Sequence, residues 1–363
     1  MARATSRVAG GATRAGAGRR LEGLDLARAL AFTGMVFAHY LASSRAEDPG
    51  WLQGLDAAAD GRAAPLFATL LGVGAGLLLA RGTSDAVLLR RGLVLGGLGL
   101  AIWPYVERVY LILPHYGLLL ALVPLARRLA DRWLLVTAAV AFTLPSLAAA
   151  VLDDDRLRSG AQPRTYDDLR DVGRVVRHLL WTGGYPLVGW AGFVAVGLWV
   201  ARRRLAAPAV QWRLLLGGAA VAATQPLWAA ALERAGGRPV PGRAEGWAAF
   251  LDSTAHANRT AWYVVAAGSA VAVIAACLLL TRTRRRWLGP LVVLGQMALS
   301  AYLAHLAVGA HWVWPWRDRE LPALEVQVAV ALGVIAALAV AAVLWRTRFR
   351  RGPVEALARA LSG

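Results

Sequence analysis

Residues 21–40 of this 363-residue chain read LEGLDLARALAFTGMVFAHY. The segment has the length and apolar character of a membrane-spanning helix, yet it contains Asp25, Arg28 and His39. Because the bilayer interior disfavours ionisable side chains, a span that keeps three of them indicates a functional site. Asp25 and Arg28 share a helical face and are expected to form an ion pair near one membrane surface. His39 lies about 16 Å further along, at ~1.5 Å per residue, toward the other surface.

The rest of the chain has the same apolar character. Hydrophobic residues make up 58% of the sequence, whereas soluble domains contain about 45–50%. Apolar runs of about twenty residues recur throughout, so the predicted fold is all-α, a polytopic membrane bundle. We expect ten spans, at residues 25–42, 63–80, 88–105, 109–126, 133–152, 180–201, 213–232, 260–280, 289–312 and 324–345. Residues 1–20 are predicted to be a disordered basic tail, and residues 346–363 a basic segment on the cytoplasmic membrane surface.

The distribution of charge predicts the orientation. The formal net charge is +18, and every basic residue is arginine. If the N-terminus is cytoplasmic, the inner loops hold most of the arginines and few of the acids, as the positive-inside rule requires. Both termini are then cytoplasmic. This role in topology explains the basic composition better than nucleic-acid binding does, and no nucleic acid is expected as a partner.

The predicted topology places all six histidines in the outer half of the protein. Histidine transfers protons near neutral pH, so this distribution suggests an extracytoplasmic site. The single cysteine, Cys277, excludes an internal disulfide and a thiolate metal cluster. The sequence contains no HExxH motif, no phosphate-binding loop and no GxSxG elbow. No metal site is therefore predicted.

Six short segments, taken in order, carry a family resemblance. They are LDLARALAFTGM (24–35), PLFATLLGVG (65–74), LPHYGL (113–118), TGGYPLVGW (182–190), LGQMALSAY (294–302) and RGPVEAL (351–357). In this order they resemble the YeiB-like bacterial membrane proteins, which are grouped as domain of unknown function 418 (DUF418). That family is similar, more distantly, to heparan-alpha-glucosaminide N-acetyltransferase and other transmembrane acyltransferases.

The resemblance implies a multi-pass acyltransferase in the bacterial inner (plasma) membrane. It implies acyl-CoA, in the first place acetyl-CoA, as a cytoplasmic co-substrate and a sugar or cell-envelope molecule as the extracytoplasmic acceptor. The chain departs from the pattern in two places. The histidine in the first outer loop of the sugar acetyltransferase has no counterpart between Ser43 and Arg62, and a Pro-His-Ser-Gly type segment of the relatives is replaced by TAHANR at residues 254–259.

An acyltransferase needs a base or acyl carrier and donors for the developing oxyanion. We predict these catalytic roles for His39, His115 and Tyr116. The acceptor is predicted to contact Tyr185, Trp190, His256, Tyr302 and His305. Arginine matches phosphate geometry, so Arg28, Arg90 and Arg91 are predicted to bind the phosphates of the co-substrate.

Two other functions fit the sequence. Spans rich in glycine and intramembrane charges also fit a transporter or exporter of a small molecule. A non-catalytic membrane scaffold is the third possibility. The partners expected in each case are the lipid bilayer and a small molecule or glycan, with a homodimer as a further possibility.

Overall fold

The computed structural model describes residues 20–41, 49–106, 108–151, 165, 167–237, 244, 246–283, 285–319 and 321–363. This described part of the chain is helical and contains no β-strand. Apart from Arg20, the predicted disordered tail at residues 1–20 lies outside the described residues.

The helices are α1 (Glu22–Tyr40), α2 (Gly50–Ala59), α3 (Ala63–Ala80), α4 (Asp85–Ile102), α5 (Leu113–Ala126), α6 (Asp131–Val151), α7 (Val172–Arg177), α8 (Leu187–Ala201), α9 (Pro208–Ala222), α10 (Gln225–Arg234), α11 (Thr260–Leu280), α12 (Gly289–Gln296), α13 (Ala298–Val308), α14 (Trp314–Arg319), α15 (Leu324–Arg348) and α16 (Pro353–Ser362). Short 3-10 or π turns include η1 (Trp103–Tyr105), η4 (His178–Thr182), η5 (Gly246–Leu251) and η7 (Gly309–Val313).

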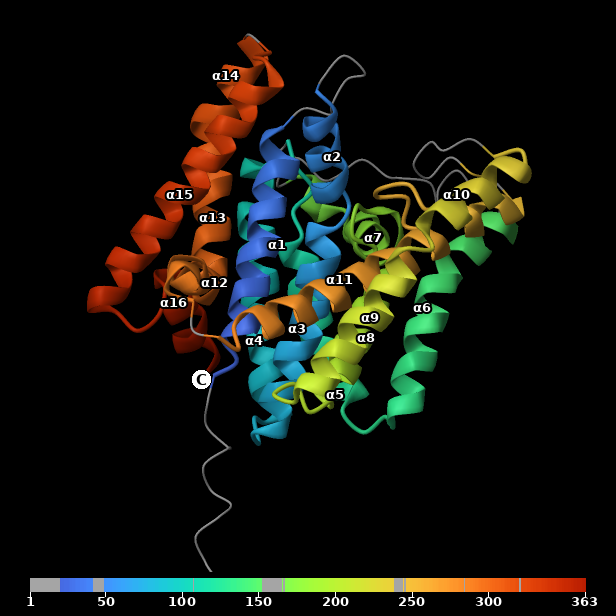
Figure 1. Cartoon of the computed structure of the whole chain (residues 1–363), viewed down its shortest axis with the longest axis horizontal. Coiled ribbons are helices and arrows are strands. Elements are labelled where there is room, and N and C mark those ends of the chain that lie inside the picture. The colour runs from blue at the N-terminus through green and yellow to red at the C-terminus, as the bar shows by residue number, and fades with distance from the viewer. Residues whose placement is uncertain are drawn as a thin grey trace, which may run out of the picture.

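Within the described residues, six segments are long and apolar enough to cross a membrane: α3, α4 with η1, α6, α9 with α10, α11 and α15. Two bent helix pairs raise this number to at most eight. The predicted all-helical membrane bundle is therefore confirmed. The ten-span prediction also includes α1, which carries three charged residues, and α5, which has only 14 residues. These two helices stand beside the apolar ones in the bundle (Figure 1).

Two predicted spans, 180–201 and 289–312, are broken rather than continuous. The segment Val172–Thr182 meets α8 at 50°, and α12 meets α13, with its continuation to Arg319, at 79°. The first break contains Pro186, which cannot donate the hydrogen bond that a continuous helix needs. The second falls at Met297, whose backbone leaves the helical region (φ −116°, ψ 30°). Hydropathy predicted continuity wrongly here because it reports composition and not backbone geometry.

Helix α1 lies in the middle of the bundle, where it contacts α3, α11, α12, α13 and α15 (Figure 1). Its first turn lies at the same end of the molecule as α16 and the end of the chain, and α14 lies at the opposite end (Figure 1). We call these the α16 end and the α14 end. Since α1 runs from one end to the other, its side chains reach sites at both.

Glycine allows α12 to touch α1 backbone to backbone. A methyl group on Gly295 would lie 1.8 Å from the carbonyl oxygen of Asp25 and 3.1 Å from the amide nitrogen of Ala29. The same kind of crossing joins α3 and α8, where a methyl group on Gly72 would lie 2.2 Å from the Val194 carbonyl oxygen. Small residues at such crossings let membrane helices pack closely.

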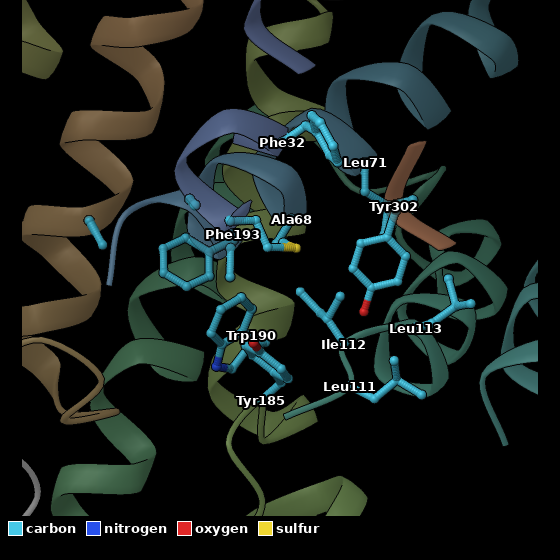
Figure 2. Packing of buried hydrophobic residues seen from close by; sticks show 14 of the residues in the cluster. Phe32, Ala68, Leu71, Leu111, Ile112, Leu113, Tyr185, Trp190, Phe193 and Tyr302 are labelled. Carbon is cyan, nitrogen blue, oxygen red and sulfur yellow. The ribbon is translucent and has the colours of Figure 1, made fainter. Parts of the chain in front are cut away.

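The centre of the bundle is a cluster of aromatic and aliphatic side chains that links both helix breaks to α1 (Figure 2). Trp190 and Phe193 of α8 are fully buried, and Tyr185 lies next to Trp190. Tyr302 of α13 points its hydroxyl toward Ile112 in this cluster (Figure 2). The packed core therefore fixes the positions of several residues that the sequence had marked as candidates.

Candidate functional site

Helix α1 brings a buried carboxylate to the α16 end. The Asp25 side chain is 1% exposed, and Arg28 Nη1 donates to its Oδ1 at 2.7 Å. Arg20 Nε donates to Asp25 Oδ2 at 2.6 Å, and this hydrogen bond raises the pKa of Arg20. Removing one partner of a buried charge pair is strongly destabilising. The two arginines therefore compensate the buried charge of Asp25, and the ion pair with Asp25 holds the Arg28 guanidinium at the α16 end.

A cavity of about 240 Å³ opens beside this ion pair. We call it the Arg28 cavity. Its polar lining comes from Arg28, Tyr116, Gln296, Tyr302 and Glu355. The Tyr116 hydroxyl donates to the Phe67 carbonyl oxygen at 3.3 Å. Met35 also lines the cavity; it lies two turns beyond Arg28 on α1, about 10 Å deeper at ~1.5 Å per residue.

The break between α12 and α13 is completed by a side chain from α16. Glu355 Oε1 accepts hydrogen bonds from the backbone amides of Leu299 at 2.8 Å and Ser300 at 3.1 Å. Its other oxygen accepts from the Ser300 hydroxyl. The first amides of a helix have no partner within the helix, and a negative charge there also interacts favourably with the helix dipole. Glu355 therefore caps α13 and fixes one wall of the Arg28 cavity.

A second cavity, of about 420 Å³, lies at the α14 end. We call it the histidine cavity. It is formed by the end of α1, the turn before α3, the segment between α4 and α5, the break before α8 and the loop before α11. Its polar lining includes His39, Asp60, Tyr110, Tyr185, His256 and Asn258. The cavity thus collects two imidazoles, a carboxylate and two phenols from segments far apart in the sequence.

His39 is paired with a second histidine behind the cavity wall. His39 Nδ1 lies 3.0 Å from His305 Nε2, and the two ring planes are within 14° of each other. The Tyr40 hydroxyl donates to the His305 carbonyl oxygen at 2.6 Å, and Trp314 Nε1 donates to the His39 carbonyl oxygen at 3.0 Å. Because one of these two nitrogens must donate and the other accept, the tautomers of the two rings are coupled.

His256 is paired with a carboxylate. Its Nε2 lies 2.8 Å from Asp60 Oδ1, and both side chains are about half exposed. Asn258, two residues further on, accepts hydrogen bonds from Trp190 Nε1 at 3.0 Å and from the Tyr263 hydroxyl at 3.2 Å. The loop before α11 is therefore anchored to buried aromatic residues on both sides.

The two cavities approach each other at Met35, which lines both. Met35 is 3% exposed and lies on α1 between Arg28 and His39. The flexible, unbranched side chain of Met35 is therefore part of the wall between the Arg28 cavity and the histidine cavity.

Other predicted site residues lie elsewhere. His115 is buried against Trp103, His178 and Tyr185, and it lines neither of the two cavities. Trp190 is buried, and its Nε1 donates a hydrogen bond to Asn258. Arg90 and Arg91 lie on α4, which packs against α16, and neither lines the Arg28 cavity.

Sequence reasoning missed Asp60, Asn258, Gln296 and Glu355 as site residues. Gln296 and Glu355 were within segments that carried the family resemblance, yet no role followed from the sequence. The contact of Glu355 with α13 spans 55 residues, and that of Asp60 with His256 spans 196. Polar residues at such separations give no local pattern. For metals, the described residues contain no group of three or more His, Cys, Asp or Glu side chains placed to hold an ion.

Comparison with known families divides the chain into two matched parts. The model described as heparan-alpha-glucosaminide N-acetyltransferase, catalytic, matches residues 20–228, and the model described as protein of unknown function (DUF418) matches residues 243–363. No curated protein matches the chain. Each cavity draws on both parts: Arg28 faces Gln296 and Glu355 in one, and Asp60 meets His256 in the other. More than half of the chain, with α1 at its start, matches the first model, and the chain therefore belongs to the family of the heparan-alpha-glucosaminide N-acetyltransferase catalytic domain, with a DUF418 segment as its second part.

Proposed function

We propose that this protein is an integral-membrane acyltransferase that takes an acyl group from acyl-CoA at the α16 end and transfers it to an acceptor at the α14 end. The single observation that carries the proposal is the pair of cavities that approach each other at Met35. Two substrates that enter from opposite membrane faces must meet inside the protein, and this arrangement provides a meeting point. The family name supports an acetyl group as the first choice.

On the donor side, a third cavity extends the Arg28 cavity toward the surface. It has a volume of about 470 Å³, and it shares Gln296 with the Arg28 cavity. Its charged lining consists of Arg285, Arg286 and Arg346 together with one carboxylate, Glu22. Guanidinium groups bind phosphates through matched pairs of hydrogen bonds. We therefore assign the nucleotide phosphates of acyl-CoA to these three arginines rather than to Arg90 and Arg91. The pantetheine arm would then run past Arg28 toward Met35.

On the acceptor side, the histidine cavity supplies the groups that acyl transfer requires. An imidazole takes the proton of the acceptor as it attacks the thioester carbonyl. His39 and His256 both line this cavity, so an outward-facing imidazole is available there as base or acyl carrier. A cavity lined by imidazole, carboxylate and phenol groups suits a hydroxylated or amino acceptor such as a sugar.

The proposed orientation has the α16 end in the cytoplasm of a bacterial cell, with ten spans. The arginine-rich cavity then faces the compartment that contains acyl-CoA. Two single-cysteine variants in a Cys277→Ser background test the orientation, because exposed Ala206 and Ala235 flank the span Pro208–Arg234. A membrane-impermeant maleimide added to intact cells should label Ala235→Cys and not Ala206→Cys. The reverse pattern would contradict the orientation.

Binding of the donor tests the function. We would follow thermal unfolding of the purified protein by intrinsic tryptophan fluorescence, with acetyl-CoA, free CoA or buffer. A ligand at 100 times its Kd stabilises the folded state by about 2.7 kcal/mol. Acetyl-CoA should raise the unfolding temperature of the wild type, and this shift should be lost in Arg285→Ala/Arg286→Ala. Arg128→Ala, an exposed arginine outside the three cavities, is the matched control and should keep the shift.

Turnover is then measured as acyl transfer from acetyl-CoA to D-glucosamine in nanodiscs. Absence of a thermal shift with acetyl-CoA and with longer acyl-CoA molecules would contradict a CoA-dependent transferase. In that case a carrier becomes the better hypothesis, and radiolabelled glucosamine uptake into proteoliposomes would test it.

A further inference from the structure

The histidine cavity contains two imidazoles in different settings. His39 is 9% exposed, and its partner is the imidazole of His305. His256 is about half exposed, and its partner is the carboxylate of Asp60. A base becomes positively charged when it takes a proton. A carboxylate stabilises that charge, and a second imidazole does not.

The backbone that presents His256 is in an uncommon conformation. Among the described residues, only His256 (φ 59°) and Asn258 (φ 51°) combine a side chain with a positive φ. Such conformations persist only where the surroundings impose them, and they concentrate at functional sites. Here Asn258 is held by Trp190 and Tyr263.

The partner segment is equally constrained. Gly61 follows Asp60 with φ 67°, and a methyl group on Gly61 would lie 3.0 Å from the Ala255 side chain. The turn before α3 and the loop before α11 therefore pack against each other closely. This contact, rather than either segment alone, sets the 2.8 Å distance between His256 and Asp60.

We propose that His256 is the general base for the acceptor, that Asp60 is its positioning residue, and that the acceptor is a hydroxyl or amino compound bound in the histidine cavity. This inference rests on the acyltransferase function proposed above. Since Asp60 occupies Nε2, Nδ1 of His256 receives the proton. Asp60 orients the ring and stabilises the imidazolium that forms.

The step balances with the two substrates and water. As His256 takes the proton, the acceptor oxygen or nitrogen forms a bond to the acyl carbon and the carbon–sulfur bond breaks. The electron pair leaves with sulfur, and the CoA thiolate takes a proton from water on the Arg28 side. His256 then returns its proton to water in the histidine cavity. No redox partner or metal is required.

The test uses the full-length protein in nanodiscs, acetyl-CoA as donor and two probe acceptors. D-glucosamine is largely protonated near neutral pH and depends on a base, whereas hydroxylamine is largely uncharged there. Hydroxylamine also gives up an N–H proton when it is acylated, but it is nucleophilic enough to react readily without a base. We expect His256→Ala to slow transfer to glucosamine by roughly 10²-fold or more, the usual contribution of a general base. Transfer to hydroxylamine should change little, and added imidazole should restore part of the glucosamine activity.

Asp60→Asn tests the positioning role. It should lower kcat with glucosamine and leave KM nearly unchanged, because the acceptor still binds but the imidazolium is less stable. The matched control is His311→Ala. His311 is an exposed histidine on η7, bonded to the Ala307 carbonyl oxygen and outside the histidine cavity, so its loss should change neither reaction.

Two outcomes would overturn the inference. The first is a wild-type rate with glucosamine in His256→Ala. The second is an equal loss with both acceptors and no rescue by imidazole, which indicates a structural role. By contrast, a wild type that transfers acetyl groups to neither acceptor would count against the acyltransferase function itself.

Discussion

The contact between α1 and α12 predicts the effect of one added methyl group. In Gly295→Ala, the new carbon would lie 1.8 Å from the Asp25 carbonyl oxygen, and ordinary van der Waals contact begins at 3.4 Å. The two helices must therefore separate locally by roughly the difference, about 1.6 Å. Overpacking of this kind costs about 1–3 kcal/mol, and a misplacement of about 1 Å can lower a reaction rate about 10²-fold. Gln296 and Arg28 lie on either side of this crossing, so the Arg28 cavity should widen and fit the acyl-CoA arm less closely.

The single native cysteine provides the assay. Cys277 is fully buried on α11, so a thiol-reactive dye labels it only when the bundle opens. Heating should expose Cys277 in Gly295→Ala at a lower temperature than in the wild type, and acetyl-CoA should stabilise the variant less in the tryptophan-fluorescence assay. The control is Gly333→Ala on α15, where the methyl group would meet nothing within 4 Å. Alanine is favoured over glycine within a helix by about 0.5–1 kcal/mol, so this variant should be as stable as the wild type or more so. Equal unfolding temperatures and equal acetyl-CoA binding in Gly295→Ala and the wild type would refute the claim that this crossing shapes the proposed donor site.

Three further predictions follow from single side chains. Asn258→Leu should lower the unfolding temperature, because Trp190 Nε1 and the Tyr263 hydroxyl lose their acceptor. Each unsatisfied group costs about 1–3 kcal/mol. An unchanged unfolding temperature would show that the loop before α11 does not depend on these two hydrogen bonds. Glu355→Ala should be less stable than Glu355→Gln, and both less stable than the wild type, in the Cys277 assay, because glutamine keeps an acceptor for the α13 amides but not the charge. Met35→Ala should raise the rate with butyryl-CoA relative to acetyl-CoA, since it enlarges the junction of the two cavities; equal ratios in variant and wild type would place the acyl group elsewhere.

Much of the helical architecture could be predicted from the sequence. The bounds 63–80 and 260–280 were predicted and agree with α3 and α11. These helices are continuous apolar runs, so composition alone determines them. The predicted bounds were less useful where a span is broken, because the turn at Met297 depends on the Glu355 cap and on packing against α1. Neither contact leaves a trace in local hydropathy.

The candidate site was only partly predictable. The sequence marked His39, His256 and His305 as individual candidates, and the structure pairs two of them with each other and one with Asp60. These pairs join segments separated by 266 and 196 residues, so no periodicity could reveal them. His115 illustrates the opposite case. Its position in the chain suggested catalysis; its ring is buried among aromatic residues and lines neither cavity, although it packs against Tyr185 of the histidine cavity.

The Glu355 cap has a consequence for the order of assembly. Glu355 follows Ser300 by 55 residues, so at a synthesis rate of about 5–20 residues per second it emerges roughly 3–11 s later. During that time the first amides of α13 lack their acceptor, and unsatisfied amides in lipid cost several kcal/mol each. The α12–α13 break therefore takes its final shape after the preceding helices have inserted. Docking of α16 onto α13, rather than insertion itself, then sets the moment at which the Arg28 cavity is complete.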